Sequence, residues 1–128
     1  MTLRTLFVIN AILAIGHGLG FIFLPGTLLM LYQVPVSAGA VLMGQLFGTE
    51  LLVVALVTWY GSRLTDAPAL SAIVLASLVA AAVGTVITAK ALADGIFGPM
   101  GWLALAIYGL LALGYLYFQL QPAKRMPS

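Results

Sequence analysis

The stretch "NAILAIGHGLGFIFL", residues 10–24, is apolar almost throughout and carries the only histidine of the chain, His17, near its middle. No charged residue occurs between Arg4 and Glu50. The apolar run can therefore hold a helix of about 20 residues, the length that crosses a hydrocarbon core of about 30 Å. These residues predict a transmembrane helix. A histidine in the middle of such a helix is expected to have a polar partner or a functional role.

The composition of the whole chain agrees with this prediction. Of 128 residues, 63% are hydrophobic and 6% are charged, whereas a soluble domain has roughly 25% charged residues. We therefore expect a single integral membrane domain, residues 1–128, in contact with the lipid bilayer. The net charge of +2 comes from few side chains, so nucleic acid is not an expected partner. The chain has no cysteine, which excludes disulfides and thiolate chemistry.

Four apolar segments are long enough to span a membrane, with Pro, Gly and Asp in the connections between them. Their unbroken apolarity favours helices over the alternating strands of a membrane barrel. The predicted fold is all-α, a four-transmembrane-helix antiparallel bundle with spans at 6–24, 39–61, 69–91 and 98–120. Between the first two spans, "TLLMLYQV", residues 27–34, is predicted as an interfacial turn with Tyr32 at headgroup level.

The basic residues predict the orientation of these spans. Cytoplasmic loops of membrane proteins carry an excess of Lys and Arg. In the four-span arrangement only Lys90 lies on one side, and the other side holds Arg4, Arg63, Lys124 and Arg125. We therefore expect both termini in the cytoplasm.

Small residues recur at the four-residue spacing that lets membrane helices approach closely. They predict packing between the spans, or self-association of the protein through its Gly/Ala faces. The candidate faces are Gly16 and Gly20 in the first span, Gly44 and Gly48 in the second, and Ala76, Ala80, Gly84 and Thr88 in the third. In the fourth span, a stripe that faces other helices is predicted at Tyr108, Ala112, Tyr115 and Gln119.

Polar residues near the middle of the spans are the candidate functional site. Counted along their helices, His17 and Glu50 both lie about 17 Å from the cytoplasmic face, and Tyr108 falls in the same layer. A carboxylate at this depth costs roughly 2.5–3.5 kcal/mol, so we expect Glu50 to turn inward. We predict an interior cluster of Glu50, His17 and Tyr108, extended by Asn10 and Gln45.

Several functions of this cluster stay open at this point. Its members can satisfy one another and fix the helix register, bind a proton, or anchor a lipophilic ligand. A further option is His17 as the axial ligand of a haem or chlorin pigment, although no cofactor is expected. The chain has no phosphate-binding loop and no H-E-x-x-H motif, so we predict no catalytic or metal-binding residues. Lys90 and Asp94 are predicted to form a solvated local pair.

Two stretches carry a resemblance to a known family. The segments "GQLFGTELLVVALVTWYGSR", residues 44–63, and "FLPGTLLMLY", residues 23–32, resemble small four-helix bacterial membrane proteins of the DoxX-like group and its relatives of unknown function. The resemblance covers roughly the first half of the chain. Gln45 stands where we expect a basic residue in that group, and Glu50 also departs from the pattern. The resemblance implies the four-helix fold and the inner (plasma) membrane of a bacterium, but no activity.

These features together predict a small, non-enzymatic integral membrane protein. We expect an accessory subunit of a membrane complex, with other membrane protein subunits as partners, or a component that binds a lipophilic ligand. The alternative is a proton-coupled exporter similar to the small multidrug exporters, with Glu50 as the proton-binding and substrate-binding acid. Those exporters have the same length and number of spans, but their glutamate lies in the first helix.

Overall fold

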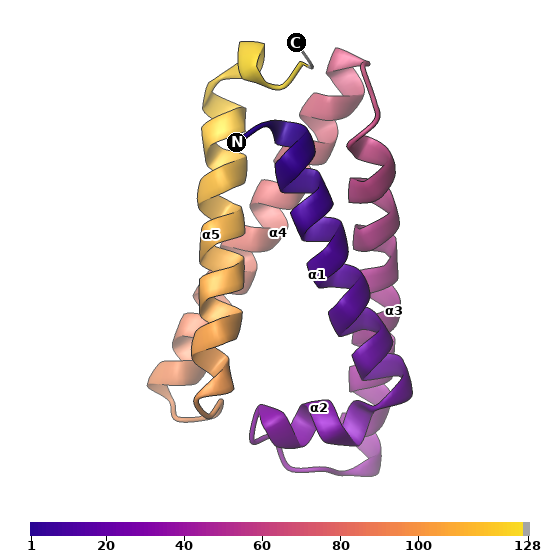
Figure 1. Ribbon diagram of the computed structural model, residues 1–128. Coiled ribbons are helices and arrows are strands. Elements are labelled where there is room, and N and C mark those ends of the chain that lie inside the picture. Colours follow the sequence, from indigo (N-terminus) through magenta and orange to yellow (C-terminus); the bar gives the residue numbers. More distant parts are fainter. Residues whose placement is uncertain (127–128) are drawn as a thin grey trace.

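The computed structural model describes residues 1–126, and every regular element in this range is helical (Figure 1). The elements are α1 (Leu3–Phe23), α2 (Pro25–Leu31), α3 (Ala38–Gly61), α4 (Ala67–Ala93), α5 (Met100–Leu120) and the short 3-10 helix η1 (Pro122–Lys124). Helices α1, α3, α4 and α5 are long and apolar enough to cross a membrane, as in a multi-pass membrane protein. The all-α prediction is therefore confirmed, and the predicted spans differ from these four helices by at most three residues at either end.

Side-chain caps begin three of the four long helices. The Thr2 side chain accepts a hydrogen bond from the backbone N–H of Thr5, and Ser37 does the same for Ala40. The carboxylate of Asp66 accepts from the backbone N–H of Ala69 at 2.9 Å. Each cap satisfies a backbone donor that the first turn of a helix leaves without a partner.

The connection between α1 and α3 differs from the prediction. The expected interfacial turn contains a helix of its own, α2, because Pro25 ends α1 and also suits the first turn of a new helix. Figure 1 shows α2 lying across the ends of α1 and α3. Tyr32 follows α2, and it is buried, with 8% of its surface exposed, rather than directed outward.

The long helices form two pairs. Helix α1 packs along α3, and α4 packs along α5, with fewer contacts between the pairs. The two pairs share an apolar core where α1 begins and α5 ends, and they separate toward the opposite end (Figure 1). In this core the rings of Phe7 and Tyr115 lie 5.9 Å apart between centroids. The other buried members of the core are Leu3, Leu6, Leu70, Val74, Ala81, Leu111 and Phe118.

Glycine determines how closely α1 and α3 approach. A Cβ added to Gly48 would lie 2.7 Å from the backbone oxygen of Gly18, and one added to Gly18 would lie 3.0 Å from the oxygen of Gly48. The predicted face of the second span is thus in use, with both Gly44 and Gly48 buried. The predicted face of the first span is confirmed only in part: Gly18 makes the contact with α3, a Cβ on Gly20 would lie 3.3 Å from the side chain of Leu28 in α2, and nothing lies within 4 Å of a Cβ on Gly16.

We predict that Gly48→Ala destabilises the fold by about 1–3 kcal/mol, the usual cost of overpacking, because the new methyl group meets backbone that cannot rotate away. The midpoint of unfolding by sodium dodecyl sulfate in mixed micelles measures this effect. Gly109→Ala is the matched control, since a Cβ at this helical position meets nothing within 4 Å. Equal midpoints for the two variants would contradict the close contact.

Candidate functional site

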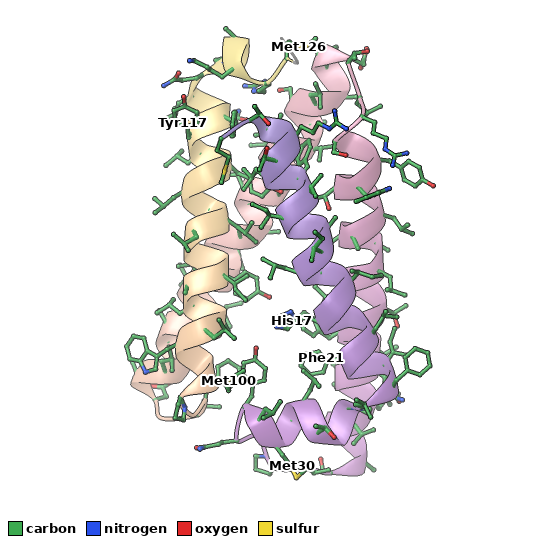
Figure 2. The ribbon with its side chains drawn as sticks, viewed as in Figure 1. His17, Phe21, Met30, Met100, Tyr117 and Met126 are labelled. Atoms are coloured by element: carbon green, nitrogen blue, oxygen red, sulfur yellow. The ribbon has the colours of Figure 1, made fainter. Side chains whose placement is uncertain are left out.

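His17 is held in one orientation by its own helix. Its Nδ1 lies 3.0 Å from the carbonyl oxygen of Leu13, one turn earlier in α1. A carbonyl oxygen only accepts hydrogen bonds, so in the neutral imidazole Nδ1–H donates and Nε2 keeps its lone pair. Figure 2 shows the His17 ring directed into the space between α1 and α5. The side chain therefore presents a hydrogen-bond acceptor to that space.

Tyr32 is the nearest polar partner of this acceptor. Its hydroxyl lies 3.5 Å from Nε2 of His17, which is long for a hydrogen bond with an O–H donor. The ring of Tyr32 packs edge-on against Phe97 at 5.7 Å, and its backbone oxygen accepts from the N–H of Gly98 at 3.4 Å. Contacts from the α4–α5 connection thus position the Tyr32 ring beside His17.

Burial raises the pKa of Tyr32 above its ordinary value of 10.0, and the neighbouring Tyr108 phenol raises it further. A raised pKa favours the neutral phenol, so Tyr32 keeps its hydroxyl proton at physiological pH. Tyr108 comes from α5, where its ring lies against α4. A Cβ added to Gly84 would lie 2.5 Å from that ring. Gly84, from the small-residue stripe predicted in the third span, therefore makes room for Tyr108.

An open apolar groove lies beside these polar groups. It has a volume of about 360 Å³. Its lining comes from α1 and α2: Ile12, Leu13, Gly16, His17, Gly20 and Leu28. Nothing lies within 4 Å of a Cβ on Gly16, so this part of the α1 wall is open, whereas Gly20 packs against the side chain of Leu28 in α2. His17 is the only polar side chain of the lining.

The predicted pairing of His17 with Glu50 is not found. Glu50 is exposed on α3, and it makes no hydrogen bond or ion pair with any residue from 1 to 126. The reason is the rotation of α3 about its axis. The helix turns Gly48 toward α1, and a residue two positions later lies about 200° around the helix. The two side chains share a depth along their helices, but they point in different directions.

The other two predicted cluster residues hold helices together. The buried side-chain amide of Asn10 donates to the hydroxyl of Tyr115 at 2.7 Å, which joins α1 to α5 inside the core. Gln45 donates from Nε2 to the backbone oxygen of Ile22 at 3.2 Å, near the end of α1. Neither residue lines the groove, so the structure brings together His17 and Tyr108 of the predicted set, with Tyr32 between them.

Sequence reasoning missed Tyr32 as a member of this site. Its place depends on the direction of α2 and on Phe97, which follows it by 65 positions in the sequence. The only local signal is the "LPG" at residues 24–26, which permits a new helix to begin.

The pigment option for His17 requires Nε2 as the metal ligand, and in the structure the hydroxyl of Tyr32 faces that nitrogen.

One predicted polar pair is confirmed away from the site. Lys90 and Asp94 form an ion pair at 2.6 Å at the end of α4, with both side chains well exposed. An exposed pair of this kind contributes little to stability.

Comparison with known families, curated proteins and solved structures finds no match to this chain. The resemblance to the DoxX-like group therefore stays a prediction.

We predict that Tyr115→Phe lowers the free energy of unfolding by about 0.6–1.7 kcal/mol, from the mean to the maximum measured for hydrogen bonds between membrane helices. The variant leaves the Asn10 amide without its acceptor inside the core. Unfolding by sodium dodecyl sulfate is again the measurement, with Tyr117→Phe as control because Tyr117 is 43% exposed. In a double-mutant cycle, Tyr115→Phe should cost less in an Asn10→Leu background. Simple additivity of the two changes would show that the bond contributes nothing.

Proposed function

We propose that this small membrane protein binds a lipophilic molecule in the groove beside His17 and has no catalytic chemistry of its own. The observation that carries the proposal is the imidazole and phenol pair, His17 and Tyr32, at an apolar groove with an open side. Ligand sites commonly have this composition, a largely apolar lining with a few polar groups that fix the orientation of the ligand.

The hydrogen-bonding capacity of the pair points to a ligand class. The contact of 3.5 Å between Tyr32 and Nε2 of His17 is weak, so both groups have capacity for a better partner. A ligand hydroxyl can donate to Nε2 and accept from the Tyr32 hydroxyl at the same time. We therefore propose a lipophilic alcohol or phenol, with its hydroxyl between the two side chains and its apolar part along Gly16 and Gly20.

The size of the groove fits one ring or the first part of a chain. A volume of about 360 Å³ is near the lower limit for small-molecule sites, which is roughly 300 Å³. The remainder of a longer ligand would extend beyond the open side of the groove, among the apolar side chains of α1. A ligand that enters from the bilayer needs no aqueous path to such a site.

The proposed cellular setting is the inner membrane of a bacterium, with both termini in the cytoplasm. The distribution of Lys and Arg and the resemblance to the DoxX-like group support it. A role as accessory subunit of a membrane complex is compatible with binding: such a subunit would present its ligand to a partner that supplies the chemistry.

The exporter alternative receives less support. An exporter of the small multidrug type needs its acid on the substrate path. Glu50 is on the exposed side of α3, whereas the groove is lined by residues of α1 and α2. We therefore favour binding at His17 over transport at Glu50.

We predict that 4-octylphenol raises the melting temperature of the purified protein in mild detergent more than octylbenzene does. The two probes differ only in the hydroxyl, and a ligand of the folded state stabilises it by RT ln(1 + [L]/Kd), so the tighter ligand gives the larger shift at equal concentration. The advantage of the phenol should disappear in His17→Leu and in Tyr32→Phe, which keeps the ring contact with Phe97.

Two further variants make this experiment specific. Gly16→Leu should abolish the effect of both probes, because its side chain fills the groove. Tyr117→Phe, on α5 and outside the groove lining, should keep the full advantage of the phenol. Equal stabilisation by the two probes, or a phenol advantage that survives in both His17→Leu and Tyr32→Phe, would overturn the proposed site.

A further inference from the structure

Glu50 is the one charged residue in the middle of a span. The other seven charged residues lie at or near the ends of the apolar segments. Glu50 lies near the centre of α3, exposed, and without a hydrogen-bond partner among residues 1–126. The nearest polar side chains along the helix use their hydrogen bonds elsewhere: Gln45 donates to Ile22, and Thr49 donates to the backbone oxygen of Gln45.

An isolated acid in this position is unfavourable. A carboxylate at the centre of a membrane helix is energetically costly, so such residues face other protein or a water-filled cavity. The single chain provides neither for Glu50. The face of α3 that carries it is therefore expected to be covered in the assembled protein.

The residues around Glu50 form a continuous seam. Exposed side chains follow one another at alternating spacings of three and four, the pattern of a helix that pairs with another helix in a left-handed coiled coil. We call this set the α3 seam: Met43, Leu46, Glu50, Val53, Val57 and Tyr60. Its apolar members are between 44% and 65% exposed. Lipid alone suits these apolar side chains, but it does not suit the acid between them.

We propose that the α3 seam binds the same seam of a second copy, in a twofold-symmetric dimer with the two Glu50 side chains facing each other. A symmetric interface places residues near its axis opposite themselves. Both copies have the same orientation in the membrane, so their Glu50 side chains lie at the same depth. Two protonated carboxylic acids are complementary, because each has one donor and one free acceptor.

A second copy provides a hydrogen-bond partner for Glu50 without requiring any residue from a different protein. A different partner would have to bring a hydrogen-bonding side chain to the centre of its own span. The dimer also leaves the groove free, since its contacts are on α3 and the groove is on α1 and α2. The inference is therefore independent of the proposed ligand, and either one can fail alone.

The absence of native cysteine makes a direct test possible. Val53→Cys places a thiol in the α3 seam, and Val86→Cys places one on α4, where that valine is 69% exposed. Oxidation with copper phenanthroline in membrane vesicles should link the Val53→Cys variant into disulfide dimers. The Val86→Cys variant is the control and should stay largely monomeric.

The role of the acid is tested on the purified protein in phospholipid nanodiscs or mild detergent. Glu50→Leu should weaken dimerisation roughly tenfold or more, because interhelical hydrogen bonds contribute up to about 1–2 kcal/mol each. Glu50→Gln keeps a donor and an acceptor and should retain most of the dimer. Leucine is well tolerated in a membrane helix, and helix content by circular dichroism verifies that the Glu50→Leu variant folds.

Three results would overturn the dimer. The first is a wild-type protein that is monomeric at every concentration, and the second is equal cross-linking of the Val53→Cys and Val86→Cys variants. The third is an adduct in vesicles between the Val53→Cys variant and a different protein, which would identify the seam as the site of another subunit.

Discussion

The close contact between the backbones of Gly18 and Gly48 is the constraint on which the rest of the structure depends. It fixes the distance between α1 and α3, and it also fixes the rotation of each helix about its own axis. Because Gly18 faces α3, its neighbour His17 is turned toward the space beside α5. Because Gly48 faces α1, Glu50 is turned away from α1. One pair of glycines thus directs His17 and Glu50 to different surfaces.

The contacts between the two helix pairs explain why a groove exists at all. At one end, Phe7 and Tyr115 pack in a shared apolar core, and the hydrogen bond from Asn10 strengthens this junction. At the other end, Tyr32 meets Phe97 and the backbone of Gly98. Between these two junctions the pairs diverge (Figure 1), and His17 lies in the region between them. Two anchored ends, with the groove beside His17 between them, suit the ligand site that we propose.

Sequence reasoning predicted the positions of the long helices well, because these positions depend on hydrophobic length alone. It did not predict how each helix is rotated about its own axis. The four-residue spacing of Gly16 and Gly20 suggested the wrong face of α1 for the contact with α3. The sequence alone does not distinguish these glycines from Gly18, because the position of α3 decides which of them makes the contact. The burial of Tyr32 was not predicted for a related reason: it depends on Phe97, which no local pattern connects to it. Glu50 was expected in the interior of the bundle because the prediction assumed that a single chain supplies the partners of its own polar residues.

The polar residues of the spans differ in how completely the chain satisfies them, and this difference separates their roles. Asn10 has a short, buried partner in Tyr115 and needs nothing more, as expected of a residue that fixes helix packing. His17 has one firm bond, to its own backbone, and one long contact with Tyr32, so it can exchange the weak contact for a ligand. Glu50 has no partner within residues 1–126. In a medium without water, unsatisfied capacity of this kind is costly, so the residue that the chain leaves least satisfied is the one that most requires another molecule.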